Sequence, residues 1–200
     1  MRITSQIAEV SALGYKSDVH KHLRRLERIW GDAPIFFVTT CTRHRKPLLA
    51  CDDIAKVLID EWCAAHDRHG WSVGGYIVMP DHVHFFCRPE LHAKPLSEFV
   101  GFWKSYTSRR VHVLNQSRSA PAATTLWQRE FFDHVLRSSE SYSEKWNYVW
   151  DNPVRAGLVS NAGEWELCWR DRNADAVAAG ADRGEMLRYA ESRITRSMCV

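Results

Sequence analysis

Apolar residues recur at two different spacings between residues 35 and 159, and these spacings predict alternating strands and helices. Short apolar and β-branched runs bounded by turn residues indicate strands, whereas apolar residues three and four positions apart indicate helices. The predicted strands are Ile35–Cys41, Trp71–Met79 and His82–Arg88, and the predicted helices are Asp52–His69 and Pro95–Val113. Gly70 supplies a stop for the first helix, and Pro80-Asp81 supplies a turn that makes the last two strands an antiparallel hairpin.

The segments that follow complete a mixed plan of strands and helices. Asn115–Thr125 is polar and predicts a loop, and Leu126–Gln128 predicts a short fourth strand. Ser139–Asp151 predicts a helix that ends at Asn152-Pro153, because the residue before a proline disfavours helical backbone. The order strand–helix–strand–strand–helix–strand, with a further helix, predicts an α+β fold with a ferredoxin-like split βαβ core and an antiparallel sheet.

The two ends of the chain carry weaker patterns. Leucines and a tryptophan at helical spacing predict a short basic helix over His20–Trp30. The stretch around Glu185–Arg196 suits either a mobile tail or a last helix. The chain therefore divides into an N-terminal arm over residues 1–30, one domain over residues 31–160 and a C-terminal extension over residues 161–200.

The composition is that of a folded protein without a membrane segment. A chain of 200 residues with 45% hydrophobic residues is long enough for one domain with flanking arms. The apolar runs are too short to span a membrane and the first residues lack a signal-peptide pattern, so we expect a cytoplasmic protein with no membrane partner. Six cysteines without a Cys-x-x-Cys pair indicate buried free thiols rather than disulfides or a zinc cluster. The net charge of +3 indicates no particular partner.

His82 and His84 are the first candidate for chemistry. Side chains two positions apart on a strand leave the same face, so the two imidazoles would form half of a site for a divalent metal, with Val83 facing the covering helices. A chain with ten histidines contains about half a His-x-His by chance, and His20-Lys21-His22 is a second example. On this pattern alone, a structural role for the pair stays open.

A second candidate lies on the predicted helix Ser139–Asp151. Its apolar face predicts a core contact, and Tyr148 lies off that face, about 200° from Trp146. Asn152 follows Tyr148 by about one turn, and its amide oxygen is a potential metal ligand. The alternative is that Tyr148 is an ordinary exposed aromatic residue and Asn152 an ordinary helix end.

Three separated blocks carry a resemblance to a known family: Pro80–His84 (PDHVH), Trp127–His134 (WQREFFDH) and Tyr148–Val159 (YVWDNPVRAGLV). They resemble the REP-associated tyrosine transposases, a branch of the single-tyrosine HUH transposases, in which HUH denotes His-hydrophobic-His. The resemblance runs from about Ile35 to Val159. It implies a ferredoxin-like core with the histidine pair on a central strand and a catalytic tyrosine on a helix that approaches it.

The resemblance also implies roles for individual residues. His82, His84 and Asn152 would hold Mg²⁺ or Mn²⁺, with Mn²⁺ preferred by nitrogen ligands and zinc still open, and Tyr148 would be the nucleophile. The implied enzyme is a single-strand DNA endonuclease and strand transferase that acts on hairpin DNA through a 5′-phosphotyrosine link, as a monomer or homodimer. The basic residues expected to contact DNA are Arg43, Arg45, Lys104, Arg109, Arg110 and Arg129. The aromatic residues that could stack on bases, although core packing is the commoner fate, are Trp71, Tyr76 and Trp127.

Two other classes of protein remain in view. A non-catalytic nucleic-acid-binding module on the same scaffold would not need the two histidines, the tyrosine and the asparagine together. A zinc hydrolase would use the histidine pair with a carboxylate, and Tyr148 would then be incidental. A domesticated transposase, which cleaves host repeats without mobilising itself, is a variant of the enzyme that the resemblance implies.

Overall fold

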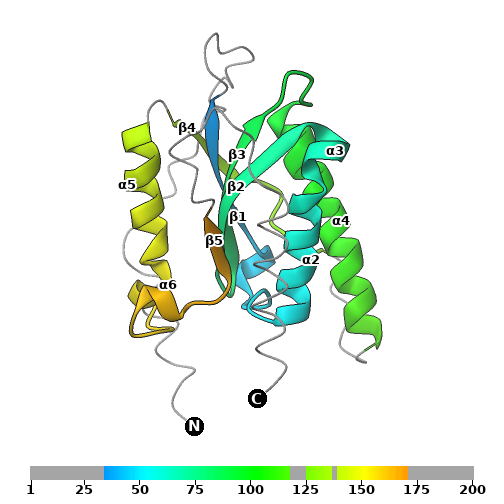
Figure 1. Ribbon diagram of the computed structural model, residues 1–200. Helices are drawn as coiled ribbons and strands as arrows, with labels where there is room; N and C mark the ends of the chain where they lie inside the picture. The colour runs from blue at the N-terminus through cyan, green and yellow to red at the C-terminus, as the bar shows by residue number, and fades with distance from the viewer. Residues whose placement is uncertain (1–33, 118–124, 137–138, 171–200) are drawn as a thin grey trace.

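The computed structural model describes residues 34–117, 125–136 and 139–170, which form an antiparallel sheet of five strands in the order β4-β1-β3-β2-β5 (Figure 1). The strands are β1 (Ile35–Cys41), β2 (Trp71–Val78), β3 (His82–Pro89), β4 (Phe132–Leu136) and β5 (Cys168–Arg170). The predicted hairpin of β2 and β3 and the α+β architecture are confirmed. The predicted basic helix over His20–Trp30, with the second His-x-His at residues 20–22, and the stretch 185–196 lie outside the described residues.

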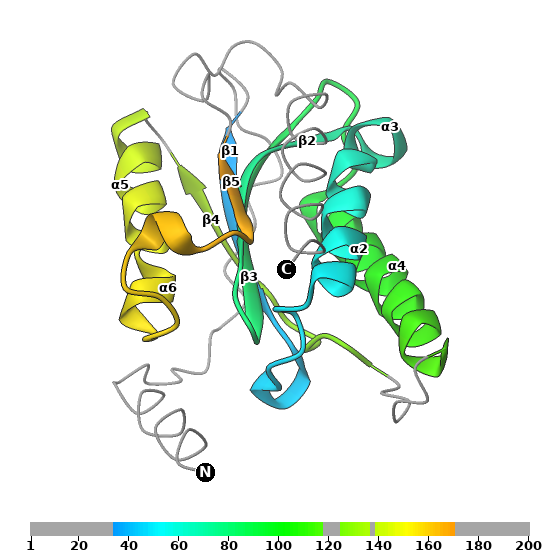
Figure 2. The same ribbon diagram turned by 60° about the horizontal axis from the view of Figure 1, so that its bottom comes forward.

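The helices form two layers, one on each face of the sheet (Figures 1 and 2). One layer consists of α2 (Asp52–Cys63), α3 (Ala65–His69) and α4 (Leu96–Ser117). The other consists of α5 (Ser139–Trp150) and the short α6 (Asn152–Arg155). Within the described ranges, no helix combines the length and the apolar character needed to cross a membrane.

The alternation of side chains along β3 assigns its residues to two separate cores. Val83, Phe85 and Cys87 are buried in the core beneath α2 and α4, and Phe86 is buried in the smaller core beneath α5. The histidine pair shares the face of Phe86, because residues two positions apart on a strand point the same way. The expected orientation of the pair, away from the side of Val83, is therefore confirmed.

Several predicted helix ends differ from the structure. The predicted helix Asp52–His69 is divided at Ala64, where α2 ends and α3 begins, and Gly70 ends α3 in the left-handed conformation (φ 70°) as expected of a glycine stop. The predicted end at Val113 is wrong, since α4 continues to Ser117 through part of the predicted loop. A hydrogen bond between Gln116 and His112, one turn apart, accompanies this end, where Leu114 alone packs against the core and the residues after it are polar, so little apolar pattern is left to read.

The predicted fourth strand at Leu126–Gln128 is wrong. Trp127 forms only an isolated bridge with Thr42, and the strand that pairs with β1 is β4, five residues further along. Leu126 and Trp127 are apolar because both side chains are buried in the α2–α4 core. The edge strand β5 was not predicted. It pairs with β2 and extends the sheet to residue 170, beyond residue 160 where the sequence pattern placed the end of the domain.

The predicted helix Ser139–Asp151 agrees with α5, which ends one residue earlier at Trp150. The proline had suggested that the chain then leaves the helical conformation, and this is wrong, because α6 follows at once. Asp151 separates α5 from α6, and Pro153 lies in the first turn of α6, where a missing backbone N–H is tolerated. Asn152 therefore begins a second short helix instead of ending the first. The thiols at positions 41, 51, 63, 87 and 168 are free, as expected, although only Cys87 and Cys168 are buried.

Candidate active site around the histidine pair

His82 and His84 lie at the start of the central strand β3, with ring centroids 4.8 Å apart and ring planes nearly perpendicular at 82°. His84 is buried (9% exposed), and the His82 side chain is 15% exposed. The backbone pairing places Thr39 of β1 directly opposite His84. The strand pairing thus fixes both imidazoles on the face of the sheet that α5 covers.

The Nδ1 atom of each imidazole has a hydrogen-bond partner. His82 Nδ1 lies 2.6 Å from Asp81 Oδ1, and His84 Nδ1 lies 2.7 Å from Thr39 Oγ1. A carboxylate accepts a hydrogen bond from Nδ1–H, and a threonine hydroxyl can accept one in the same way. In this tautomer each Nε2 carries a lone pair, which is the usual arrangement of histidines that bind a metal. The pair therefore fits a divalent cation through its two Nε2 atoms.

Burial and the surrounding charges keep His84 in the form that binds metals. Burial lowers the pKa of His84 well below its ordinary value, and the nearby charges of His82, Arg45, Lys145 and Arg155 lower it further. His84 is therefore neutral at neutral pH, and a neutral imidazole is the ligand form. Burial raises the pKa of Asp81, but its hydrogen bond to His82 and the Arg45 guanidinium, 2.8 Å away, more than offset this and lower the pKa overall.

Tyr148 lies on α5 with its side chain at the surface (58% exposed), on the polar side of the helix as the helix periodicity predicts. Lys145 connects it to the histidine pair. The Lys145 Nζ atom lies 5.6 Å from the centroid of the Tyr148 ring and 5.1 Å from the centroid of the Phe37 ring. Phe37 in turn stacks on His84, with centroids 5.3 Å apart. Three consecutive contacts therefore join Tyr148 to His84.

Asn152 has a different partner in this structure. Its Oδ1 accepts a hydrogen bond from Arg155, which also donates to the backbone oxygen of Tyr148 and places its guanidinium 4.3 Å from the Tyr148 ring centroid. The described residues contain no group of three or more His, Cys, Asp or Glu side chains able to hold a metal ion. A third ligand beside the histidine pair would have to be of another type, such as an amide oxygen, and the role of Asn152 stays a prediction.

Residues 35–151, more than half of the chain, match the model of the family described as Transposase IS200 like. The chain belongs to this family. It is 24% identical over 96 residues to a REP-associated tyrosine transposase of Escherichia coli, a match that covers 48% of this chain and 52% of that protein. It is 23% identical over 111 residues to a protein of Haemophilus influenzae that carries the same family name, with 54% of this chain and 63% of that protein covered. These matches span between half and two thirds of the two relatives.

A solved structure shares the fold of this IS200-like chain. It is described as a REP-associated tyrosine transposase bound to a REP hairpin, and its TM-score is 0.57 at 18% identity, over 78% of this chain and 86% of that one. This likeness confirms the predicted α+β architecture. The matched family segment contains the histidine pair and Tyr148, and ends one residue before Asn152.

Two of the arginines expected to contact DNA lie beside the site. Arg43 and Arg45 belong to the short 3₁₀ helix η2 (Arg43–Arg45) that follows β1, and Arg45 binds Asp81, the partner of His82. His44 and Arg45 both have left-handed backbone (φ 60° and 54°), a costly conformation for residues other than glycine. Arg43 donates to Thr125, and Arg129 has a side chain that is 97% exposed. Their contact with DNA stays a prediction.

Lys104, one of the residues expected to contact DNA, is buried between α4 and the segment before β4 instead of lying on the exposed side of the helix. The residue is 9% exposed, and its Nζ lies 3.0, 3.3 and 2.9 Å from the backbone oxygens of Gln128, Arg129 and Glu130. Burial lowers the pKa of Lys104 to about 8. The ammonium holds the segment before β4 against α4, which is a structural task that the helix periodicity alone does not reveal.

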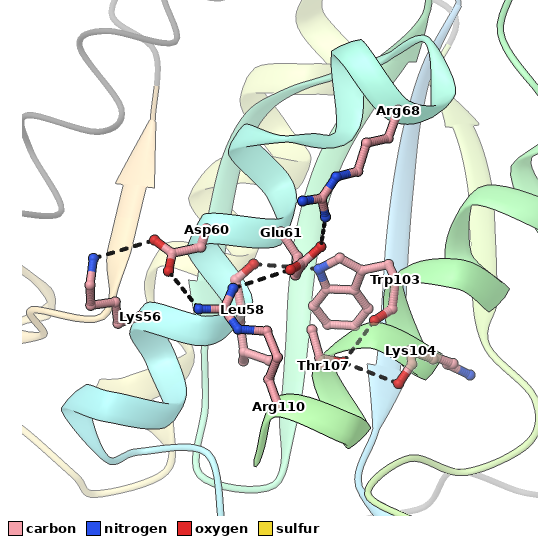
Figure 3. Close-up of polar contacts among 9 residues, drawn as sticks. All are labelled: Lys56, Leu58, Asp60, Glu61, Arg68, Trp103, Lys104, Thr107 and Arg110. Atoms are coloured by element: carbon pink, nitrogen blue, oxygen red, sulfur yellow. Dashed lines mark hydrogen bonds and ion pairs between the residues drawn. The ribbon is translucent and has the colours of Figure 1, made fainter. Parts of the chain in front are cut away.

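Arg109 and Arg110 lie on α4, in the helix layer on the opposite face of the sheet from α5 (Figure 2). Figure 3 shows Arg110 turned toward α2, where it pairs with Asp60 and with Glu61, and Glu61 also pairs with Arg68. Arg109 lies over the Tyr106 ring. The two arginines are therefore not gathered with the histidine pair. The aromatic residues considered for base stacking are all buried in the α2–α4 core: Trp71, Tyr76 and Trp127.

Sequence reasoning did not single out three residues that the structure adds to the site. Thr39 contacts His84 from a neighbouring strand, and only the strand register shows this. Lys145 lies one turn before Tyr148 on the predicted helix, but its contact with Phe37 depends on how α5 docks and leaves no sign in the sequence. Arg155 lies within the third block of the family resemblance, which was the available signal for it.

Proposed function

We propose that this chain is a transposase-type enzyme that cleaves and rejoins single-stranded DNA, with Tyr148 as the nucleophile. The observation that carries the proposal is the histidine pair with both Nδ1 atoms engaged, joined to an exposed tyrosine through Phe37 and Lys145. Two imidazoles held through their Nδ1 atoms, with His84 neutral, are suited to a cation, and an exposed phenol is suited to a large substrate. A structural histidine pair needs neither feature.

His82 and His84 would hold the cation, and Asn152 would join them once its amide oxygen leaves Arg155. When bound, a Mg²⁺ or Mn²⁺ ion would polarise a non-bridging oxygen of the DNA phosphate and so ease attack on the phosphorus. Two imidazole nitrogens favour Mn²⁺ over Mg²⁺. Asp81 and Thr39 hold the two Nδ1 atoms and so would fix the orientation and tautomer in which Nε2 carries the lone pair.

The chemistry conserves the energy of the phosphodiester bond. The Tyr148 oxygen forms a bond to phosphorus as its proton leaves, the bond from phosphorus to the 3′ oxygen breaks, and that oxygen takes up a proton. The products are a 5′-phosphotyrosine link and a free 3′-hydroxyl. Attack by another 3′-hydroxyl on the phosphotyrosine reverses the sequence and joins two strands, so no nucleotide cofactor is needed.

The proposed substrate is a DNA hairpin with a single-stranded flank. The solved relative is described as bound to a REP hairpin, and we extend this substrate class to the present chain. Of the expected DNA contacts, Arg45 lies beside Asp81, Arg43 lies in the same short helix and Arg129 is exposed, and each would pair with a backbone phosphate. The enzyme would act as a monomer or a homodimer.

The test is an adduct assay with a hairpin oligonucleotide and Mn²⁺, resolved on a denaturing gel. We expect the wild type to form a covalent protein–DNA adduct that chelation abolishes. Tyr148→Phe should form none. Tyr142→Phe is the matched control, since Tyr142 lies on the same helix but is buried (2% exposed) in the core beneath α5. An adduct that persists in Tyr148→Phe and vanishes in Tyr142→Phe would reassign the nucleophile.

One observation favours a second candidate function, a hairpin-binding module without catalysis. Arg155 engages the Asn152 oxygen, and a cation held by two histidines alone is weakly bound. If the wild type binds the hairpin but forms no adduct with either Mn²⁺ or Mg²⁺, the binding module replaces the enzyme. The zinc hydrolase is disfavoured because the described residues offer no carboxylate to complete a three-ligand site.

A further inference from the structure

The ammonium group of Lys145 differs from the other cations near the core in what surrounds it. Its contacts in the described part of the chain are with two aromatic rings, Phe37 at 5.1 Å and Tyr148 at 5.6 Å. A ring face attracts a cation but does not neutralise its charge. The side chain is also only partly exposed, so water screens this charge less than it would on an open surface.

Other cations in the fold have partners that account for them. Arg45 pairs with the Asp81 carboxylate, and Lys104 donates to three backbone oxygens. Lys94 resembles Lys145 most closely, since its Nζ lies 5.0 Å from the Phe102 ring, but it also lies 3.0 Å from the Glu98 carboxylate. Among the described residues, Lys145 is thus a cation without a carboxylate partner, and it lies between the Phe37 ring that stacks on His84 and the ring of Tyr148.

We propose that Lys145 binds the phosphate that Tyr148 attacks. This inference rests on the proposed function and names a further residue of the same site. Lys145 lies between the His84-stacked ring of Phe37 and the ring of Tyr148, so a phosphate placed within reach of both the histidines and the phenol meets its ammonium. The negative charge on the phosphate oxygens grows as the phenol attacks, and a fixed cation stabilises that growing charge.

Arg155 is less suited to this role, although it also lies beside Tyr148. Its Nη2 atom donates to Asn152 Oδ1 and to the backbone oxygen of Tyr148, so this side chain holds the junction of α5 and α6 together. Lys145 makes no such bond with the described residues, and it lies one turn before Tyr148 on the same helix. A change at Lys145 therefore alters charge at the site without removing a contact of the junction.

The first experiment measures DNA binding by the full-length protein without metal, in a Tyr148→Phe background with a chelator present. The affinity for a hairpin oligonucleotide with a single-stranded flank is followed between about 50 and 200 mM salt. We expect Lys145→Met to reduce the slope of log affinity against log salt by about one, as the loss of one phosphate contact does. Lys145→Arg should restore the slope. Lys94→Met, which removes a lysine from a similar aromatic contact on the other helix layer, should leave it unchanged.

The second experiment measures adduct formation with intact Tyr148 and Mn²⁺ at saturating DNA. Lys145→Met should lower the rate constant at least about tenfold, with partial rescue by Lys145→Arg. The inference is overturned if the wild type forms the adduct and Lys145→Met matches Lys94→Met in both salt slope and rate constant. The proposed function would then still stand. A wild type that forms no adduct overturns the proposed function and the role of Lys145 with it.

Discussion

Thr39→Val is the most direct test of how the strand pairing prepares the histidine pair. Valine has nearly the shape of threonine and suits a strand, so the substitution removes the hydroxyl while the packing is kept. His84 Nδ1 then loses its partner at 2.7 Å in a residue that is only 9% exposed. Two consequences follow, one for folding and one for metal binding.

The magnitude of each consequence can be worked out from the buried contact. A buried polar group left without its partner costs about 1–3 kcal/mol, and a protein of this size loses roughly 2–4 °C in Tm for each kcal/mol. Loss of the group that orients a metal-binding histidine typically weakens metal affinity about 10- to 100-fold. We therefore expect Thr39→Val to melt several degrees below the wild type and to bind Mn²⁺ at least about tenfold more weakly.

The matched control is Thr40→Val at the next position on β1. Thr40 is 1% exposed, faces the opposite side of the sheet, and its hydroxyl is buried without a hydrogen-bond partner in the described structure. Its replacement should be neutral or slightly stabilising and should leave Mn²⁺ affinity unchanged. Calorimetric titration with Mn²⁺ and thermal melting of the metal-free protein give both readouts. The reasoning is refuted if Thr39→Val binds Mn²⁺ as the wild type does and melts with Thr40→Val.

Three further predictions concern the scaffold. Glu61→Gln should lower the free energy of unfolding in urea by about 1–2 kcal/mol, because this 7% exposed carboxylate pairs with both Arg68 and Arg110. Asp60→Asn, at a more exposed carboxylate of the same cluster, should lower it by less than about 1 kcal/mol. Equal losses would contradict the central place of Glu61 in the cluster. Lys104→Met should cost about 1–2 kcal/mol in the same assay because three backbone oxygens lose their donor, with Lys56→Met on the surface as a control near zero. Cys87 should resist a thiol reagent in the folded protein, since burial raises the pKa of this thiol well above its ordinary value and the thiolate is the reactive form. Mass spectrometry of labelled native and urea-unfolded samples measures this. Rapid labelling of Cys87 in the native protein would refute the prediction.

The parts of the fold that depend on repeating patterns of apolar residues could be predicted from the sequence. The period of two in β3 placed the histidines on one face and Val83 on the other, and the phase of α5 placed Tyr148 away from Trp146. Both predictions hold because the core selects apolar residues at a fixed period. The α5–α6 junction was misjudged because proline in the first turn of a helix is as acceptable as proline after its end.

Features that depend on contacts between distant segments could not be predicted from local pattern. Lys104 looks like any polar helix residue until the segment 128–130 is placed against it. Tryptophan is common in strands, which favoured a strand at Trp127, yet this residue is buried next to α4, where its indole donates a hydrogen bond to Thr107. The pairing of Thr39 with His84 follows from the register of two strands separated by more than forty residues.

The alternation of β3 has a consequence for the kinds of sequence change that this protein can tolerate. The same strand supplies the histidines to one layer and Phe85 to the other, and the turn at Pro80-Asp81 sets which residue faces which way. Insertion or deletion of a single residue in that turn could shift β3 by one position against β1. The two sets would then be exchanged, with the imidazoles in the larger core and Phe85 on the face beneath α5. Substitutions around the site would change its activity by degrees, whereas a change in the length of the turn would abolish the site in one step.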